Sequence, residues 1–224
     1  GVSLNANPLI TNLLESDDTN KSNIFEKDIN LEIDIDKVYF DKIHSVKNLK
    51  GNLKIKNNNI VDANILAFYN NAKNISFTIR TTDQGNKITT IFSSLAKPLV
   101  SRYKFIKGFK DNKDGFLDFY SSKKNGVSKS KLIIDNFKVK EIPVLAKLLA
   151  LASLQGIADL LTGEGIRFTD FEMNFTNENK VMRIQELYAI GPAISILLEG
   201  YIEDDKLISL RGTLVPATTI NRSI

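Results

Sequence analysis

LEIDID, residues 31–36, alternates large aliphatic side chains with carboxylates. Successive side chains of a β-strand point to opposite faces, so this period of two gives one face that leaves water and one that stays wet. The same alternation recurs at residues 53–56, 75–80, 170–175 and 194–199. The sequence therefore predicts a mainly β protein.

Short polar clusters separate the alternating segments. They read KNNN at 56–59, KKNG at 123–126, NENK at 177–180 and EDDK at 203–206. Asn, Asp and Gly tolerate the backbone conformations that tight hairpin turns require. Because such connections join antiparallel neighbours, we predict a long antiparallel meandering sheet of about ten or more strands.

We interpret the chain as three parts. Residues 1–29 are expected to hold the end of a preceding strand and a polar linker. Residues 30–113 would form a first β repeat with a short helix, and residues 114–224 a second β repeat with a long apolar helix. On this interpretation the chain is a fragment of a longer protein.

Two shorter helical segments are also expected. One is a helical turn at residues 9–14, which precedes the polar stretch ESDDTNKSN at 15–23. The other is the short helix of the first repeat, near residues 83–105, which Pro98 interrupts.

The long helix is predicted over residues 143–161, which read PVLAKLLALASLQGIADLL. Pro143 suits the first turn of a helix, and two glycines follow the last turn. The polar residues Lys147, Gln155 and Asp159 fall within a stripe of about 120°. Burial of the large apolar residues would contribute on the order of 12–24 kcal/mol gross. These residues are Leu145, Leu148, Leu149, Leu151, Leu154, Ile157, Leu160 and Leu161.

Three environments could cover such a helix. A transmembrane position is marginal or unfavourable, because Lys147 and Asp159 offset the apolar residues. The concave face of the predicted sheet is the second possibility. Lipid is the third, either as acyl chains in a groove or as a membrane interface.

The order of elements from Pro143 to Asn221 closely resembles the AsmA-like C-terminal region of YhdP-type proteins from Gram-negative envelopes. The matching residues of the helix and the following strand are Pro143, Leu145, Ala146, Leu148, Leu149, Ser153, Leu154, Gly156, Asp159, Leu160, Leu161, Gly163, Gly165, Ile166 and Phe168. Further matches are Gly191, Pro192, Gly200, Gly212, Pro216 and Asn221. A looser match precedes them at Asp83, Gly85 and Gly115.

This resemblance implies a fold and a function. AsmA-like proteins are similar to bridge-type lipid carriers, whose repeated strands curl into a gutter with an apolar lining. The chain would then be a non-enzymatic, cofactor-free part of a periplasmic protein that transfers phospholipid between the inner and outer membranes and supports outer-membrane integrity. The resemblance also implies an inner-membrane anchor outside this chain and possible envelope protein partners.

The candidate groove residues follow from the alternation on the strands after the long helix. The strand candidates are Phe171, Met173, Phe175, Met182, Ile184, Ile194, Ile196, Leu198, Ile208, Leu210 and Leu214. The helix candidates are Leu145, Leu148, Leu149, Leu154, Ile157 and Leu161. A register error of one residue would move a whole strand to the other face.

Composition argues against several other classes. The chain has no cysteine and a single histidine, His44, so thiolate chemistry and most histidine-dependent mechanisms have no residues to use. The carboxylate pairs, at residues 17–18 and 203–205, lie in predicted loops or turns. No phosphate-binding loop, dinucleotide motif or nucleophile elbow is present. We therefore expect a protein that is not an enzyme and binds no metal.

Charge is uneven along the chain. Residues 141–224 carry 7 basic and 11 acidic side chains, and residues 1–140 carry 23 and 15. Basic charge can favour anionic lipid or nucleic acid, but no basic cluster is interleaved with aromatic residues. We expect no nucleic acid partner.

Two alternatives from other classes stay open. One is a β-rich periplasmic interaction or assembly module for outer-membrane biogenesis, with its groove plugged by its own helix. The other is a lipid-modifying enzyme, which would need a polar constellation inside the groove.

Overall fold

The computed structural model describes residues 1–6, 28–56, 59–100, 115–204 and 207–217. The chain divides into two compact units, Gly1–Ser94 and Leu95–Ile224, which we call the N-terminal and C-terminal units. The expected helical turn at 9–14 and the polar stretch at 15–23 lie outside the described residues. So does the carboxylate pair at 17–18.

Six strands form the N-terminal unit. They are β1 (Ser3–Asn5), β2 (Ile29–Tyr39), β3 (Ser45–Lys56), β4 (Asn59–Asn70), β5 (Lys73–Thr81) and β6 (Lys87–Ser93). The C-terminal unit contains α2 (Lys97–Val100), β7 (Leu117–Lys124), β8 (Val127–Val139), α3 (Pro143–Leu151), α4 (Gln155–Thr162), β9 (Ile166–Glu178), β10 (Val181–Ile190), β11 (Ile194–Glu203) and β12 (Leu207–Pro216).

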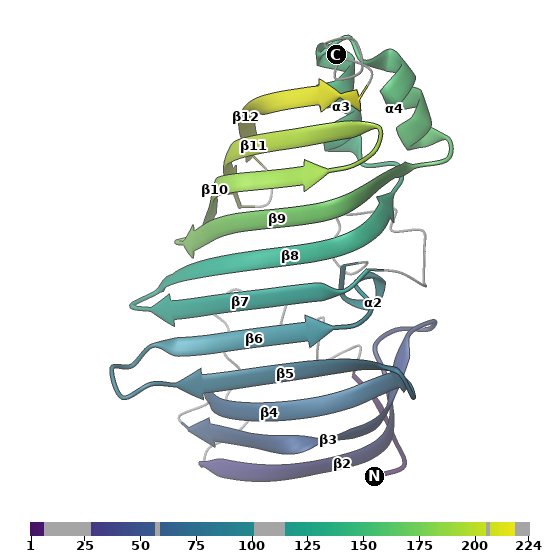
Figure 1. The fold of residues 1–224 in the computed structure, drawn as a ribbon. Helices are drawn as coiled ribbons and strands as arrows, with labels where there is room; N and C mark the ends of the chain where they lie inside the picture. Colours follow the sequence, from purple (N-terminus) through teal and green to yellow (C-terminus); the bar gives the residue numbers. More distant parts are fainter. Residues whose placement is uncertain (7–27, 57–58, 101–114, 205–206, 218–224) are drawn as a thin grey trace. The chain divides into compact units, whose positions relative to one another are not determined.

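The mainly β prediction is confirmed. Twelve strands follow one another in chain order in a sheet that does not close on itself (Figure 1). The pairs from β2 to β6 and from β7 to β12 are antiparallel. The sheet is nevertheless mixed, because β1 pairs parallel with β2 through Ser3–Asn5 and Lys37–Tyr39. The purely antiparallel prediction was wrong for this short strand.

Two of the predicted hairpin turns lie within the described residues. Asn125 and Gly126 both have positive φ angles, of 51° and 81°. Asn179 and Lys180 also have positive φ, at 49° and 65°. Two adjacent residues with positive φ are what a type I′ turn requires, and this turn matches the right-handed twist of the strands it joins.

The prediction of one long helix over 143–161 was wrong. The segment forms two short helices, α3 and α4, because α3 ends in a Schellman motif. Ser153 has a φ of 58°, its N–H donates to the Ala150 carbonyl, and the N–H of Leu154 donates to the Leu149 carbonyl at 2.9 Å. These bonds satisfy the last carbonyls of α3 and turn the chain before α4 begins.

The helix predicted near residues 83–105 was also wrong over most of the part that the structure describes. Residues 87–93 form β6, whose Phe92 and Ile91 pair with β5. Only Lys97–Val100 is helical, and Pro98 lies at the second position of this single turn, where its missing N–H is not needed.

Each unit has its own apolar core. In the N-terminal unit a cluster of apolar residues packs around β2, β3 and β4. Its buried members are Ala6, Val38, Phe40, Val46 and Ala67. In the C-terminal unit Met173, Phe175 and Ile184 form the centre of a second cluster. Among the described helices none is long and apolar enough to cross a membrane.

Candidate functional site

The candidate groove residues of the C-terminal unit share one face of the strands β7–β12. Residues directly opposite one another in neighbouring strands point to the same face. The pairings define four cross-strand rows on this apolar face, numbered from the helical end. Row 1 contains Leu117, Ile134, Phe171, Ala189, Ile196 and Leu214. Row 2 contains Phe119, Leu132, Met173, Leu187, Leu198 and Gly212.

The two remaining rows lie nearer the β7–β8 turn. Row 3 contains Ser121, Ser130, Phe175, Ile184, Gly200 and Leu210. Row 4 contains Lys123, Ser128, Asn177, Met182, Ile202 and Ile208. Ile194, the remaining strand candidate, lies two residues before Ile196 and alternates onto the same face. All eleven strand candidates therefore lie on one face of one layer of strands.

A β-bulge in β10 places two residues that alternation alone misses. The pairing of β10 with β9 and β11 shifts between Ile184 and Leu187. The extra residue reverses the alternation, so Leu187 and Ala189 join the apolar face. Strict alternation from Ile184 would have placed Tyr188 there instead.

A second irregularity extends the apolar face toward the helices. Phe137 pairs with Phe168 and Asp135 with Asp170 in an unshifted register, but Asn136 between them has a φ of 46°. The ring of Phe137 stacks on Phe168 at 5.6 Å and meets the edge of Phe171 at 6.0 Å. These aromatic contacts connect the strand ends beside the helices to row 1.

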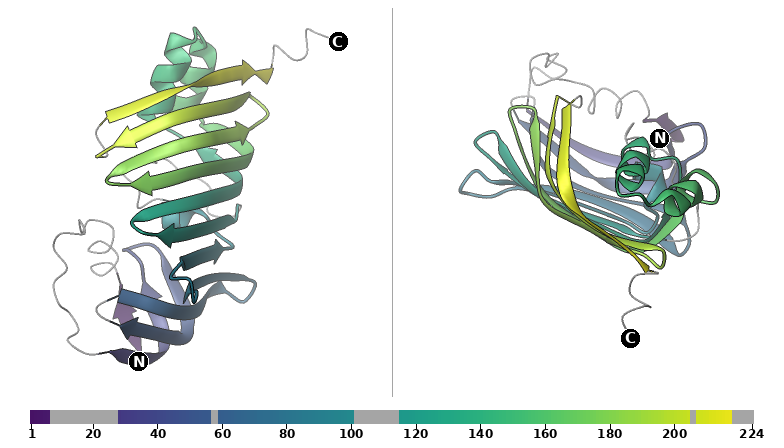
Figure 2. Two further views of the ribbon diagram at one scale, coloured as in Figure 1. Left: turned by 90° about the vertical axis from the view of Figure 1, so that its left-hand side faces the viewer. Right: turned by 90° about the horizontal axis from the view of Figure 1, so that it is seen from above.

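Burial is greatest at the helical end of this face. Ile166, Phe168 and Ile194 are almost completely buried there. Toward the opposite end, Phe175 and Ile184 of row 3 are still buried, whereas Met182, Ile202 and Leu210 are half-buried. The helices α3 and α4 lie at one end of the strands, opposite the β7–β8 and β9–β10 turns (Figures 1 and 2). The most buried residues of the face therefore lie at the same end of the strands as the helices.

The helix candidates divide by exposure. Leu149 and Leu161 are fully buried and Leu145 nearly so, while Leu148, Leu154 and Ile157 are half-buried. The expectation that Leu151 and Leu160 are buried was wrong, because their exposed fractions are 84% and 44%. Splitting the helix rotates α4 relative to α3, so the two do not present one continuous stripe.

The opposite face of β8–β10 is polar and carries a hydrogen-bonded network. The Lys131 ammonium lies 2.7 Å from a carboxylate oxygen of Glu172, and the hydroxyl of Tyr188 donates to the other oxygen at 3.0 Å. The contact with Lys131 lowers the pKa of Glu172, and the same contact raises the pKa of Lys131. The hydrogen bond to Glu172 raises the pKa of Tyr188. The two faces of this sheet therefore differ sharply in chemistry.

The N-terminal unit repeats the same two-faced design. Ile33, Ile65 and Phe77 lie in one cross-strand row, opposite a face that carries Glu32 and Asn64. One polar pair interrupts its apolar side, where Tyr69 and the fully buried Ser93 hydrogen-bond at 2.9 Å. Burial raises the pKa of Tyr69 to about 12, so its hydroxyl stays neutral.

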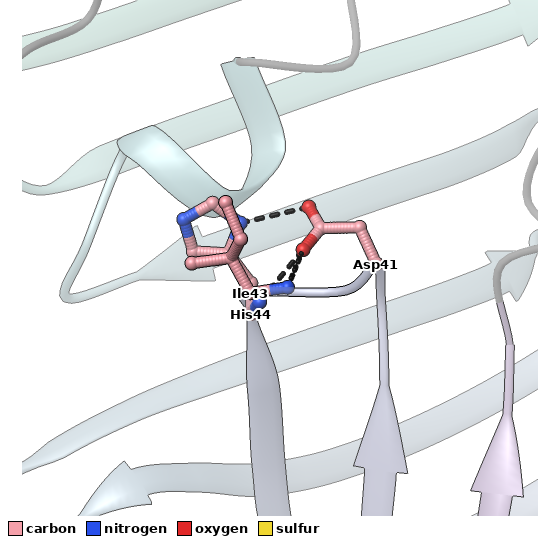
Figure 3. Close-up of polar contacts among 3 residues, drawn as sticks. All are labelled: Asp41, Ile43 and His44. Atoms are coloured by element: carbon pink, nitrogen blue, oxygen red, sulfur yellow. Dashed lines mark hydrogen bonds and ion pairs between the residues drawn. The ribbon is translucent and has the colours of Figure 1, made fainter.

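His44 belongs to a turn in the N-terminal unit. One oxygen of Asp41 accepts the backbone N–H groups of Ile43 and His44, both at 2.7 Å, and the other meets the His44 ring Nδ1 at 2.7 Å (Figure 3). Burial opposes ionisation of Asp41, but these hydrogen bonds outweigh it and lower its pKa. This geometry closes the β2–β3 connection.

Two surface hollows lie in the N-terminal unit. One of about 440 Å³ is lined by Asp34, Asp36, Asn48, Lys50, Leu66 and Phe68. A shallower one of about 610 Å³ runs beside it along β2 and β3. Neither is lined by a candidate groove residue. In the described ranges, no group of three His, Cys, Asp or Glu side chains could hold a metal ion.

The apolar face is therefore the surface that geometry singles out. Most positions in its four rows carry apolar side chains, and none of the rows contains an Asp or a Glu. Comparisons with known protein families, with curated proteins and with solved structures found no match to this chain.

Proposed function

We propose that the chain is a non-enzymatic, AsmA-like part of a periplasmic protein whose apolar face holds phospholipid acyl chains during transfer between the inner and outer membranes. One observation carries the proposal. The four rows of the C-terminal unit form an apolar surface on a single layer of strands, while the other face is polar and hydrogen-bonded.

Physical chemistry explains why such a face needs a partner. Apolar surface leaves water with a gain of roughly 25 cal/mol per Å², and monomers seldom expose large contiguous apolar patches. A bent sheet would turn this face into an apolar groove, with the helices at one end of it. Acyl chains would complete the burial nearer the β7–β8 turn. The inner-membrane anchor and envelope protein partners belong to this proposal, in parts outside the chain.

Two neighbouring residues of β12 provide a matched test. Ile208 lies on the apolar face in row 4 and is 40% exposed, whereas Leu207 lies on the opposite face and is 52% exposed. Neither side chain is needed to fill the core, so both Asp variants should fold. A carboxylate at 208 would lie among acyl chains and be costly to bury, while one at 207 would stay in water.

The measurement is native mass spectrometry with lipid extraction on the full chain, purified from a Gram-negative envelope. The proposal predicts bound phospholipid in the unmodified protein and in Leu207→Asp, and its loss in Ile208→Asp. Equal phospholipid in the two variants would contradict a role for this face. Circular dichroism verifies that each variant is folded.

One observation favours a second function, the interaction or assembly module. Leu149 and Leu161 are fully buried, which is what helices that cover the helical end of the face would show. If that cover extended over the whole face, the protein would carry no lipid. Lipid-free protein, with α3 and α4 strongly protected from hydrogen exchange, would support this function instead.

A further inference from the structure

Polar residues interrupt the apolar face of the C-terminal unit at one corner only. Rows 1 and 2 contain no polar side chain. In rows 3 and 4 the polar residues lie on β7, on β8 and near the C-terminal end of β9. They form what we call the donor corner. Its members are Ser121, Lys123, Ser128, Ser130 and Asn177.

The strand register brings these side chains together. Lys123 lies opposite Ser128, and Ser128 lies opposite Asn177. Ser121 lies opposite Ser130 in the next row. Side chains directly opposite each other in a sheet have Cβ atoms about 4.5–5.5 Å apart, so the five polar groups form one contiguous patch.

The hydrogen bond within the donor corner leaves other donor groups of the corner available to a ligand. Ser130 is buried and donates its hydroxyl to Ser121 at 2.9 Å. The hydroxyl hydrogen of Ser121 is then free to donate to a ligand. Within the described part of the chain, the side chains of Lys123, Ser128 and Asn177 make no hydrogen bond or ion pair. Those three side chains are half-buried or exposed and can be reached.

The charge of the corner has one sign. None of the four rows contains an Asp or a Glu, and the single charge in them is the ammonium of Lys123. Hydroxyl, amide and ammonium donors around one positive charge suit the oxygens of a phosphate group. The same rows continue without interruption into apolar side chains. These are Phe175, Ile184, Leu210, Met182, Ile202 and Ile208.

We infer that the donor corner binds the phosphate group of the lipid whose acyl chains lie on the apolar face. This inference rests on the proposed function and adds the orientation of the ligand. The phosphate would lie beside the β7–β8 turn, and Figure 1 shows this turn at the end of the strands opposite α3 and α4. The acyl chains extend from it across β10, β11 and β12.

Two neighbouring lysines of β7 provide the test. Lys123 lies on the apolar face and Lys124 on the opposite face, and both are exposed. Lys123→Gln removes the positive charge of the corner, and Lys124→Gln removes the same charge from the other face. Both variants of the full chain should fold, as circular dichroism will show.

The probes are vesicles that contain either phosphatidic acid or diacylglycerol with the same acyl chains, which differ only in the phosphate. Protein incubated with each vesicle is separated, and its bound lipid is quantified after extraction. The unmodified protein and Lys124→Gln should retain phosphatidic acid in preference to diacylglycerol. Lys123→Gln should lose about tenfold in retained phosphatidic acid, as expected for one charge-assisted hydrogen bond, with diacylglycerol unchanged.

The outcomes separate the two proposals. If both lipids are retained equally and Lys123→Gln has no effect, the donor corner does not bind phosphate although the face holds lipid. If neither lipid is retained, the proposed function and the inference both fail. Inorganic phosphate, titrated alone, distinguishes the source of the anion. Binding of free phosphate at the corner as tight as that of phosphatidic acid would overturn the orientation we infer.

Discussion

Truncation of one buried leucine in α3 should destabilise the C-terminal unit far more than truncation of an exposed leucine two residues away. Leu149 is fully buried, whereas Leu151 has an exposed fraction of 84%. Leu149→Ala removes buried methyl groups and leaves a cavity, which typically costs about 2.7–5 kcal/mol. Leu151→Ala alters a side chain that is already in water, so its effect should stay within about 0.5 kcal/mol.

Scanning calorimetry of the full chain measures this difference directly. For a domain of this size, each kcal/mol shifts Tm by about 4 °C. The transition of the C-terminal unit should therefore fall by about 10–20 °C in Leu149→Ala and by about 2 °C or less in Leu151→Ala. Similar shifts in the two variants would refute the conclusion that Leu149 anchors α3 in the core of the C-terminal unit.

Four further predictions concern local features. Asp41→Ala should destabilise the N-terminal unit by about 1–3 kcal/mol, because two N–H groups and His44 lose their acceptor. Since folding lowers the pKa of Asp41, this contribution is complete above its ordinary value near 4 and is lost as the pH falls through the lowered one. The Tm difference between wild type and variant should thus close in acid, and a difference independent of pH would contradict the assignment. Gly156→Ala should stabilise α4 by about 0.5–1 kcal/mol, since the added carbon would meet no atom within 4 Å beyond its chain neighbours and the backbone of its own helix. Gly212→Ala should accelerate hydrogen exchange in β12, because its Cβ would meet the Leu197 carbonyl. Glu172→Gln should lower the pKa values of Tyr188 and Lys131, read by NMR titration, and unchanged values would show that the network does not persist in solution.

The strands could be predicted from sequence because their signal is local. Alternation such as that of Ile33 and Ile35 needs only the neighbouring residues, and the Asn125–Gly126 turn has its own chemical signature. The parallel pairing of β1 could not be predicted in this way, since it depends on a contact with residues 37–39.

The break between α3 and α4 could not be predicted from the local sequence pattern. The apolar run reads through Ser153 without a proline, and the left-handed conformation of this residue is fixed by the two bonds that end α3. Ser153 and Gly156 were the only hints, as small residues that interrupt the leucines.

Alternation in the sequence identified many residues of the apolar face correctly, but it did not identify all of them. Alternation placed Met173 and Ile196 on one side of a strand, but the bulge in β10 moved Leu187 and Ala189 there as well. The donor corner was missed entirely, because a search for apolar residues passes over Lys123 and its neighbours. A search for polar residues at the alternating positions that share a strand face with the apolar residues would have found them.

The most direct test of lipid binding is photo-crosslinking at two adjacent positions of β12. Leu210 lies in row 3 on the apolar face, and Arg211 lies on the opposite face, where it pairs with Glu199 at 2.8 Å. A benzoylphenylalanine is introduced at each position in turn, in cells with a Gram-negative envelope, and the irradiated protein is analysed by mass spectrometry. The proposed function predicts a phospholipid adduct at 210 and none at 211. No adduct at 210, or equal adducts at both positions, would contradict it.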